Sequence, residues 1–175
     1  MLLPCKQRIV GSIPTGSTRN YMKKLYLDTE FTQLNHEAKL ISIALVDENE
    51  EYYYAELSDT YEESDCSSFV KEIVLPLLKG GSYLKPNSQV AFELGNWIED
   101  RGPGCILAND APTWDFPFIH KLLDYYWPSN LSHDKVHLVI PSDELLHELY
   151  VKDGLKRHNA LDDALALKRY DAKIT

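Results

Sequence analysis

The stretch KLYLDTEF at residues 24–31 decides the fold class, because it begins a series of three short segments with high β propensity. Its apolar and polar side chains partly alternate, as is typical of a β-strand. Two more such segments follow, LISIALV at 40–46 and EYYYAEL at 51–57, with the polar turn 47–50 between them. The three segments predict a β-meander at the start of the domain.

The rest of the chain has the pattern of alternating helices and strands. The expected elements are helices at 68–79, 87–99, 114–126, 141–151 and 159–170, and strands at 105–108 and 136–140. Pro76 lies inside the first of these helices and is expected to kink it. Strands first, then alternating helices and strands, predict an α/β fold with a mixed, roughly five-stranded sheet flanked by helices.

Composition limits the classes of function. The 175 residues include 18 Lys and Arg against 27 Asp and Glu, a formal charge of −9. The length indicates one domain, and no apolar run reaches the roughly 18 residues of a membrane span. Three cysteines without a CxxC pair favour a reduced, cytoplasmic setting. The acidic excess argues against binding nucleic acid by charge alone, but it leaves open binding of phosphate through metal ions.

Residues 1–21 differ from the rest of the chain. They contain Lys6, Arg8 and Arg19, no acidic residue and no regular apolar period. They also lack the apolar core of about 7–15 residues that a secretory signal needs. We expect a non-native leader from an over-long reading frame, with the true start at Met22; a flexible tail is the alternative. The folded domain is expected to span residues 22–175.

The first acidic segment of interest is Asp28-Thr29-Glu30, at the end of the first predicted strand. Side chains alternate along a strand, so Asp28 and Glu30 project to the same side. Two neighbouring carboxylates repel each other unless a cation lies between them, and Mg²⁺ favours such oxygen ligands. Taken alone, the segment also fits a turn or a solvated face.

Two other acidic segments come later in the chain. Asp115 lies among aromatic residues where a buried strand is expected to lead into a helix. His158 precedes Asp162 and Asp163 at the head of the last predicted helix. Each segment alone also fits a helix cap.

The order of these motifs resembles the DEDDh branch of the DnaQ-like 3′–5′ exonucleases, which have the RNase H-like fold. The similarity runs from about Lys24 to Tyr170 and is greatest to small bacterial and phage exoribonuclease-type members. Asp28-Thr29-Glu30 matches the Asp-x-Glu motif, Asp115 the second acid, and His158 to Asp163 the His-x₄-Asp motif.

Two positions leave alternatives. Many family members carry an Asn a few residues before the second acid. Here Asn109 lies further from Asp115 than in that pattern, so Asp110 is an alternative to Asp115 as the second acidic ligand. Residues four apart lie on the same face of a helix, which favours Asp162 as the partner of His158. The His-x₄-Asp motif of the family favours Asp163 instead. We expect Asp115 and Asp163 to be the ligands.

The resemblance implies a two-metal site. Asp28, Glu30, Asp115 and Asp163 would hold two Mg²⁺ or Mn²⁺ ions, with Asp28 bridging them. His158 would be the general base, and its ordinary pKa of about 6.5 suits that role. Paired ions of this kind activate the attacking water and stabilise the leaving oxygen of a phosphodiester.

Substrate contacts are expected at Thr29, Phe31 and Trp114. Phe31 directly follows the first motif and is placed to stack on a terminal base, as aromatic residues do in single-strand binding. Phe31 and Trp114 also fit the core. Lys152, Lys156 and Arg157 precede His158 and either attract the phosphate backbone or form a solvated basic loop.

The leading prediction is a metal-dependent 3′–5′ exonuclease that releases nucleoside 5′-monophosphates from the 3′ ends of single-stranded RNA or DNA, with RNA favoured. An RNase H-like endonuclease and a non-catalytic nucleic-acid-binding module are the alternatives. The family type also allows a homodimer, and Tyr52, Tyr53 and Tyr54 fit packing residues or a dimer contact. His133 and His137 have the spacing of a zinc pair but no third ligand nearby.

Overall fold

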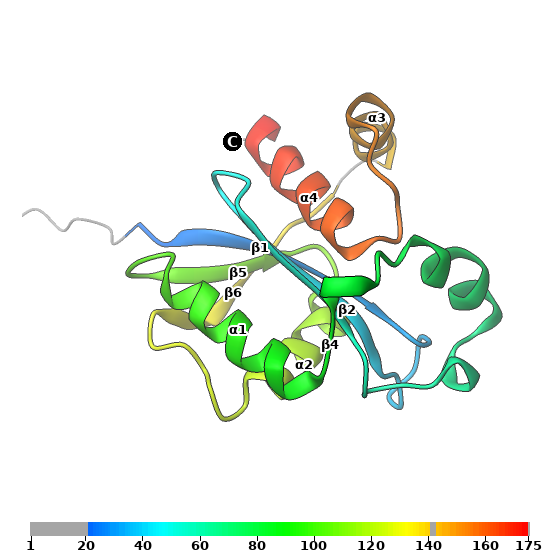
Figure 1. The fold of residues 1–175 in the computed structure, drawn as a ribbon. Coiled ribbons are helices and arrows are strands. Elements are labelled where there is room, and N and C mark those ends of the chain that lie inside the picture. The colour runs from blue at the N-terminus through cyan, green and yellow to red at the C-terminus, as the bar shows by residue number, and fades with distance from the viewer. Residues whose placement is uncertain (1–20, 141–142, 175) are drawn as a thin grey trace, which may run out of the picture.

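The computed structural model describes residues 21–140 and 143–174 (Figure 1). The leader expected at 1–21 therefore lies outside the described residues, apart from Tyr21. The strands are β1 (Lys23–Phe31), β2 (Leu40–Asp47), β3 (Tyr52–Leu57), β4 (Leu84–Lys85), β5 (Cys105–Asn109) and β6 (Leu131–His137). The α-helices are α1 (Asn87–Glu99), α2 (Pro112–Leu123), α3 (Asp143–Asp153) and α4 (Ala160–Ile174).

The strands form one mixed sheet in the order β4-β3-β2-β1-β5-β6. The predicted meander is confirmed, because β2 pairs antiparallel with both β1 and β3. On its other side β1 pairs in parallel with β5, and β5 pairs in parallel with β6. β1 thus lies inside the sheet, and its carboxyl end lies on the same edge as that of β5.

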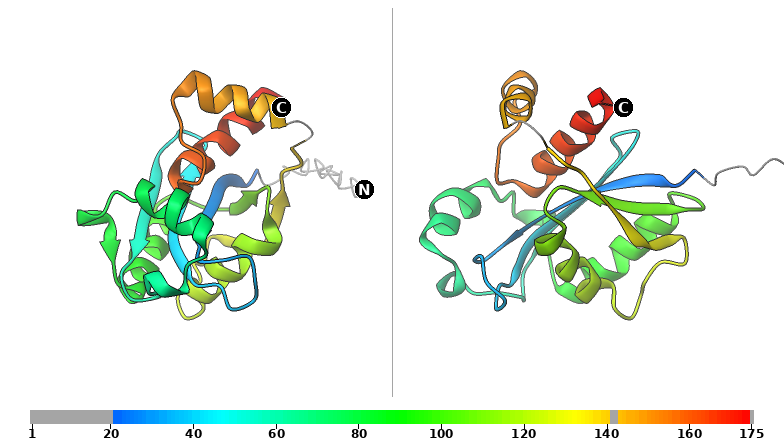
Figure 2. Two further views of the ribbon diagram at one scale, coloured as in Figure 1. Left: turned by 90° about the vertical axis from the view of Figure 1, so that its right-hand side faces the viewer. Right: turned by 180° about the vertical axis from the view of Figure 1, so that it is seen from behind.

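Helices cover both faces of the sheet (Figures 1 and 2). α1 and α2 pack on one face, where the largest apolar cluster includes Leu25, Leu27, Leu94 and Ile119. α4 packs on the other face against a second cluster, which includes Tyr26 and Leu161. α3 packs on the outside of α4. The expected α/β class with helices flanking a mixed sheet is confirmed.

The predicted helix at 68–79 is wrong in form. The chain instead makes a π-helical turn at Val70–Val74 and a 3₁₀ turn at Leu75–Leu77. Pro76 has no backbone N–H and its ring clashes with the preceding helical turn, so a regular α-helix does not continue through it. Short 3₁₀ turns also occur at Glu63–Asp65 and Gly81–Tyr83.

The last strand was placed too late at 136–140, since β6 ends at His137. β6 is an edge strand whose middle residues are largely exposed, so it lacks the apolar run that marks a buried strand. The sixth strand, β4, has two residues and was not predicted. The helix expected from residue 87 to 99 has the same bounds as α1.

None of the helices in the described part of the chain has the length and apolar character needed to cross a membrane.

Candidate active site

The side chains of β1 alternate between the two helical layers. Leu25 and Leu27 belong to the cluster beneath α1 and α2, whereas Tyr26 belongs to the cluster beneath α4. The alternation therefore directs Thr29 toward α2, and Asp28 and Glu30 toward the layer that contains α4. The end of β1 thus supplies polar groups to both sides of the sheet.

A cavity of about 520 Å³ lies at this end of β1. The five residues expected to carry the chemistry all line it, from four separate segments: Asp28, Glu30, Asp115, His158 and Asp163. Thr29, Phe31 and Trp114 line it as well. Asp28 on β1 and Asp163 on α4 are 135 residues apart in the chain, and both line this one cavity.

Glu30, His158 and Asp163 form one close group of candidate ligands. One ligand atom from each lies within 4.8 Å of the others, a spacing that allows the three to hold one metal ion. Two carboxylates and an imidazole are a usual donor set for divalent cations.

Asp115 is fixed by two side-chain hydrogen bonds. The hydroxyl of Thr29 donates to Oδ1 of Asp115 over 2.6 Å, and the amide of Asn109 donates to Oδ2 over 2.8 Å. Asp115 lies in the first turn of α2 and is 2% exposed. The competing Asp110 does not line this cavity but contributes to a smaller one of about 270 Å³ beside it.

Asp163 is also held by two hydrogen bonds. The backbone N–H of His158 donates to Oδ2 over 2.9 Å, and the hydroxyl of Tyr150 donates to Oδ1 over 2.5 Å. The neighbouring Asp162 instead accepts a hydrogen bond from the backbone N–H of Lys156 and lines neither cavity. Of the two competing acids, Asp163 is the one at the site.

His158 lies before the start of α4, and its backbone has a φ of 67°. This left-handed conformation is uncommon for a residue other than glycine and recurs at functional sites. The imidazole ring packs edge-on against the ring of Phe69, with centroids 5.0 Å apart. Burial lowers the pKa of His158, and the neighbouring Arg157 lowers it further, so both effects favour the neutral ring.

Burial raises the pKa of all four carboxylates, and the charges of Asp115 and Asp163 raise those of Asp28 and Glu30 further. Burial raises the pKa of Glu30 to about 8 and that of Asp163 to about 7, and the charge of Asp163 contributes to the rise at Glu30. Burial raises the pKa of Asp115 to about 6 despite the hydrogen bonds from Thr29 and Asn109, which lower it. The pKa of Asp28 is raised by burial and then by the other three carboxylates.

One buried carboxylate, Asp115, and three half-buried ones, Asp28, Glu30 and Asp163, lie close together here, and divalent cations offset the cost of ionising them. Oxygen donors in this number fit Mg²⁺ or Mn²⁺. Of the four expected carboxylates, Glu30 and Asp163 have ligand atoms within 4.8 Å of each other, together with His158, whereas Asp28 and Asp115 line the same cavity outside that group.

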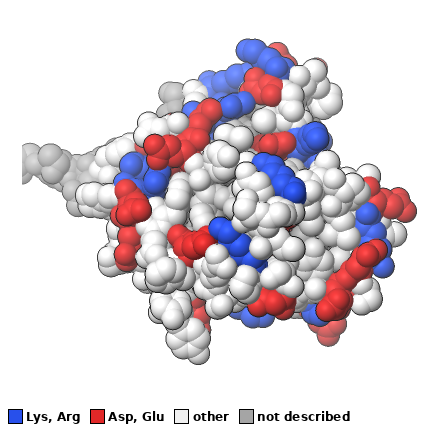
Figure 3. All heavy atoms as spheres, viewed as in Figure 1, with Lys and Arg blue, Asp and Glu red and all other residues white. Residues whose placement is uncertain are grey.

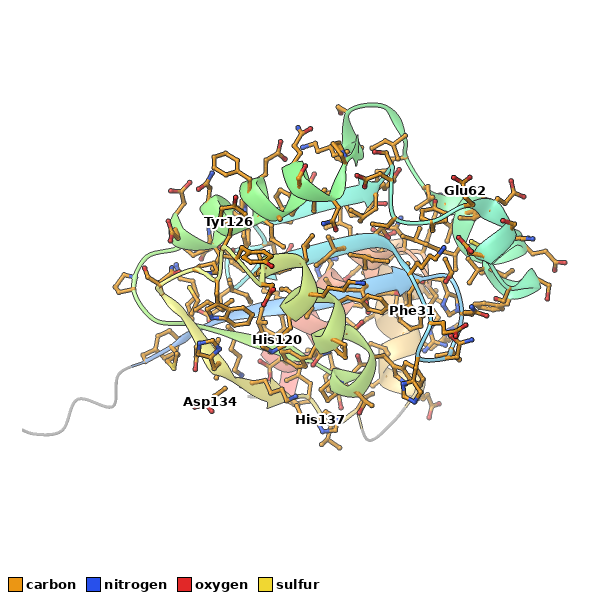
Figure 4. All side chains as sticks on the ribbon, turned by 90° about the horizontal axis from the view of Figure 1, so that it is seen from below. Phe31, Glu62, His120, Tyr126, Asp134 and His137 are labelled. Carbon is orange, nitrogen blue, oxygen red and sulfur yellow. The ribbon has the colours of Figure 1, made fainter. Side chains whose placement is uncertain are left out.

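Aromatic rings form one wall of the cavity. The ring of Phe31 stacks against those of Trp114 and Phe118, with centroid distances of 6.0 and 5.3 Å. Phe31 lies beside α2 at the end of β1 (Figure 4). Phe69 and Leu34 line the cavity too, and their side chains are largely exposed. The cavity thus combines an acidic floor with an apolar wall.

On the face seen in Figure 3, Lys and Arg lie in small groups among Asp and Glu. Lys152, Lys156 and Arg157 are exposed, and Arg157 also lines the smaller cavity, next to Asp28 and Asp163.

The other residues singled out in the sequence lie elsewhere. His133 stacks on Trp127, and Nε2 of His137 lies 3.1 Å from the carbonyl oxygen of Asp110. Among the described residues, these two histidines form no metal-binding group. Tyr53 and Tyr54 are buried and only Tyr52 is exposed, which leaves little of the tyrosine run for a dimer contact.

Three residues that contact the site residues were not predicted from the sequence. Asn109 entered the sequence comparison only through its spacing from the second acid, whereas its side-chain amide donates a hydrogen bond to Asp115. Tyr150 and Phe69 come from segments without any motif, and only tertiary packing brings them to Asp163 and His158. No periodic or spacing signal identifies them.

No protein-family model and no curated protein matches the sequence. Two solved structures of exonuclease I from E. coli are similar in fold. A zinc-bound complex with single-stranded DNA has a TM-score of 0.53 at 13% identity, and a complex with a dA16 oligonucleotide has 0.52 at 14%. Each match covers 86% of this chain, which spans only 39% and 40% of the two neighbours. The chain thus has the RNase H-like fold of exonuclease I.

Proposed function

We propose that this protein is a metal-dependent 3′–5′ exonuclease that hydrolyses single-stranded nucleic acid to nucleoside 5′-monophosphates. The observation that carries the proposal is that Asp28, Glu30, Asp115, His158 and Asp163 line one cavity. The fold shared with exonuclease I, whose solved complexes contain single-stranded DNA, supports it. RNA is the proposed preferred substrate because the sequence motifs resemble those of exoribonuclease-type family members.

The four carboxylates would hold two Mg²⁺ or Mn²⁺ ions, which would activate the attacking water and neutralise charge that builds up on the phosphate oxygens. His158 would accept the proton from that water. A neutral imidazole is the competent form of a general base, and burial and Arg157 both shift the pKa of His158 toward that form. Because His158 precedes α4, its side chain is attached to a loop rather than to a helical turn.

The apolar wall would bind the end of the strand. A base stacked on Phe31 would lie against a ring that Trp114 and Phe118 already hold in place. Such stacking tolerates any base, because every base has a π-face. The acidic surface of the protein is compatible with this role, since bound metal ions would supply the positive charge that attracts the phosphate.

The test is digestion of single-stranded RNA and DNA that carry a 5′ label and either a free or a blocked 3′ end. Each substrate is incubated with Mg²⁺, with Mn²⁺ or with EDTA. We expect a ladder shortening from the free 3′ end, release of 5′-mononucleotides, faster loss of RNA, and no reaction in EDTA. Internal cuts on the blocked substrate would indicate an endonuclease, and binding without any cleavage would indicate a binding module.

A further inference from the structure

The second hydrogen bond to Asp163 comes from outside the three sequence motifs. Tyr150 lies on α3, is 8% exposed, and donates its hydroxyl proton to Oδ1 of Asp163. The ring is held in a small apolar cluster with Leu146 and Ala166. α3 packs mainly on α4, so this hydrogen bond links an outer helix to the candidate site.

The bond restricts the orientation of the Asp163 carboxylate. With Oδ2 accepting from the backbone N–H of His158 and Oδ1 accepting from Tyr150, rotation about the terminal side-chain bond breaks one or both bonds. Asp163 also belongs to a group of candidate ligand atoms, with Glu30 and His158, that lie within 4.8 Å of one another. Its orientation therefore sets where a ligand oxygen points.

Tyr150 is placed as an outer partner of the site and not as a ligand. Its ring borders the smaller cavity, which Asp28, His158 and Asp163 also line. The guanidinium carbon of Arg157 lies 5.2 Å from the centre of the same ring, on the segment that leads into His158. The Tyr150 ring thus contacts Arg157, which precedes the His158-to-Asp163 motif, and Ala166, which follows it.

We propose that Tyr150 is a positioning residue, which orients the carboxylate of Asp163 for metal binding through the hydrogen bond from α3. This inference rests on the proposed function, since it assumes that Asp163 binds a divalent cation. Partners that orient a ligand typically contribute about 10- to 100-fold to metal affinity. Removing the hydroxyl is expected to weaken metal binding in that range while the chain stays folded.

The chain provides two matched controls for Tyr150→Phe. The hydroxyl of Tyr26 donates to Oδ2 of Asp171 over 2.6 Å, a buried tyrosine–carboxylate bond in which neither residue lines the two cavities at the site. Tyr26→Phe therefore removes the same kind of hydrogen bond at a distance from the candidate ligands. The hydroxyl of Tyr170 is buried and has no hydrogen-bond partner within residues 21–140 and 143–174, so Tyr170→Phe removes a hydroxyl and none of the described bonds.

The experiment is a titration of full-length protein with MnCl₂, followed by calorimetry and by the shift in melting temperature, for the wild type and the three variants. We expect Tyr150→Phe to raise the dissociation constant about 10-fold or more. The two controls should keep the wild-type constant, even if Tyr26→Phe melts at a lower temperature in EDTA.

The outcomes separate the two levels of the proposal. If Tyr150→Phe binds Mn²⁺ as tightly as the wild type, Tyr150 is not a positioning residue. If Tyr26→Phe weakens binding equally, the effect is one of general stability and the inference is wrong. If the wild type itself binds no Mn²⁺, the proposed function fails first.

Discussion

The hydroxyl of Thr29 lies 2.6 Å from Oδ1 of Asp115, a buried hydrogen bond between residues 86 positions apart. It joins the middle residue of the Asp-x-Glu motif to the acid of α2. The alternation of β1 explains the contact, because Thr29 faces α2 while Asp28 and Glu30 face the opposite layer. Thr29 was expected to contact substrate, and the structure adds a role in holding Asp115.

Thr29→Ala is expected to reduce nuclease activity, because Asp115 loses one of its two orienting bonds. The loss of a bond of this kind typically costs about 10- to 100-fold in metal affinity or activity. Thr29→Ser keeps the hydroxyl and should recover most of the rate. The measurement is kcat at saturating Mg²⁺, with Thr113→Ala on the exposed start of α2 as the control. Equal rates for the Ala and Ser variants would contradict the role of the hydroxyl.

Asp163→Asn and Asp162→Asn form a matched pair on consecutive residues. Asp163→Asn removes a proposed ligand and should cost more than the about 10- to 100-fold typical of outer partners. Asp162→Asn should keep near wild-type activity, because Asp162 accepts a backbone hydrogen bond and does not line the cavity. Mononucleotide release and Mn²⁺ binding are measured for both. An active Asp163→Asn variant with an inactive Asp162→Asn variant would reverse the assignment.

The stability of the metal-free protein should fall as the pH rises. Burial raises the pKa of Glu30 to about 8 and of Asp163 to about 7 in the folded chain, above their unfolded values. A raised folded-state pKa gives stability that is present at low pH and is lost as the pH rises through the folded value. The loss is expected between about pH 5 and pH 8.

Melting temperatures in EDTA across this range test the expectation, with Glu30→Gln as the comparison, because a glutamine does not titrate. The wild type should lose stability relative to Glu30→Gln as the pH rises. Mn²⁺ should raise the wild-type melting temperature more at pH 8 than at pH 5, since ions compete with protons for the carboxylates. Parallel curves for the two proteins would contradict the raised pKa of Glu30.

Phe31→Ala should weaken substrate binding more than it slows the chemical step. Base stacking on an aromatic side chain contributes about 1–3 kcal/mol per base. The dissociation constant for a short single strand is measured in a His158→Ala background, where cleavage is expected to be slow. Phe92→Ala on α1 is the control, because Phe92 is 60% exposed and does not line the cavity. A similar loss of affinity in the two variants would exclude a specific role for Phe31.

The sequence was most informative where a local pattern determines geometry. Strand alternation predicted that Asp28 and Glu30 point to the same side, and both line the cavity. The apolar stripe from Val90 to Ile98 predicted α1 with the bounds that the structure has. In both cases the residue pattern of a single strand or helix is enough to predict the geometry.

The sequence was least informative where position depends on tertiary packing. β6 was misplaced because an edge strand needs no apolar pattern, and the helix at 68–79 was overestimated because Pro76 interrupts it. Helix-face spacing pointed to Asp162 because it assumed that His158 is helical, whereas α4 begins at Ala160. Tyr150 reaches Asp163 only because α3 packs on α4, and no local pattern encodes that contact.

The central claim is that Asp28, Glu30, Asp115, His158 and Asp163 form one nuclease site. The most direct test compares cleavage by the wild type and by Asp28→Asn of one single-stranded RNA that carries a labelled 3′-terminal nucleotide. Enzyme is in excess over RNA and the Mn²⁺ concentration is the same for both proteins. We expect the wild type to release the labelled nucleoside 5′-monophosphate and the variant to release none at a comparable rate. Equal release by the two proteins, or no release by the wild type, would contradict the proposed nuclease site.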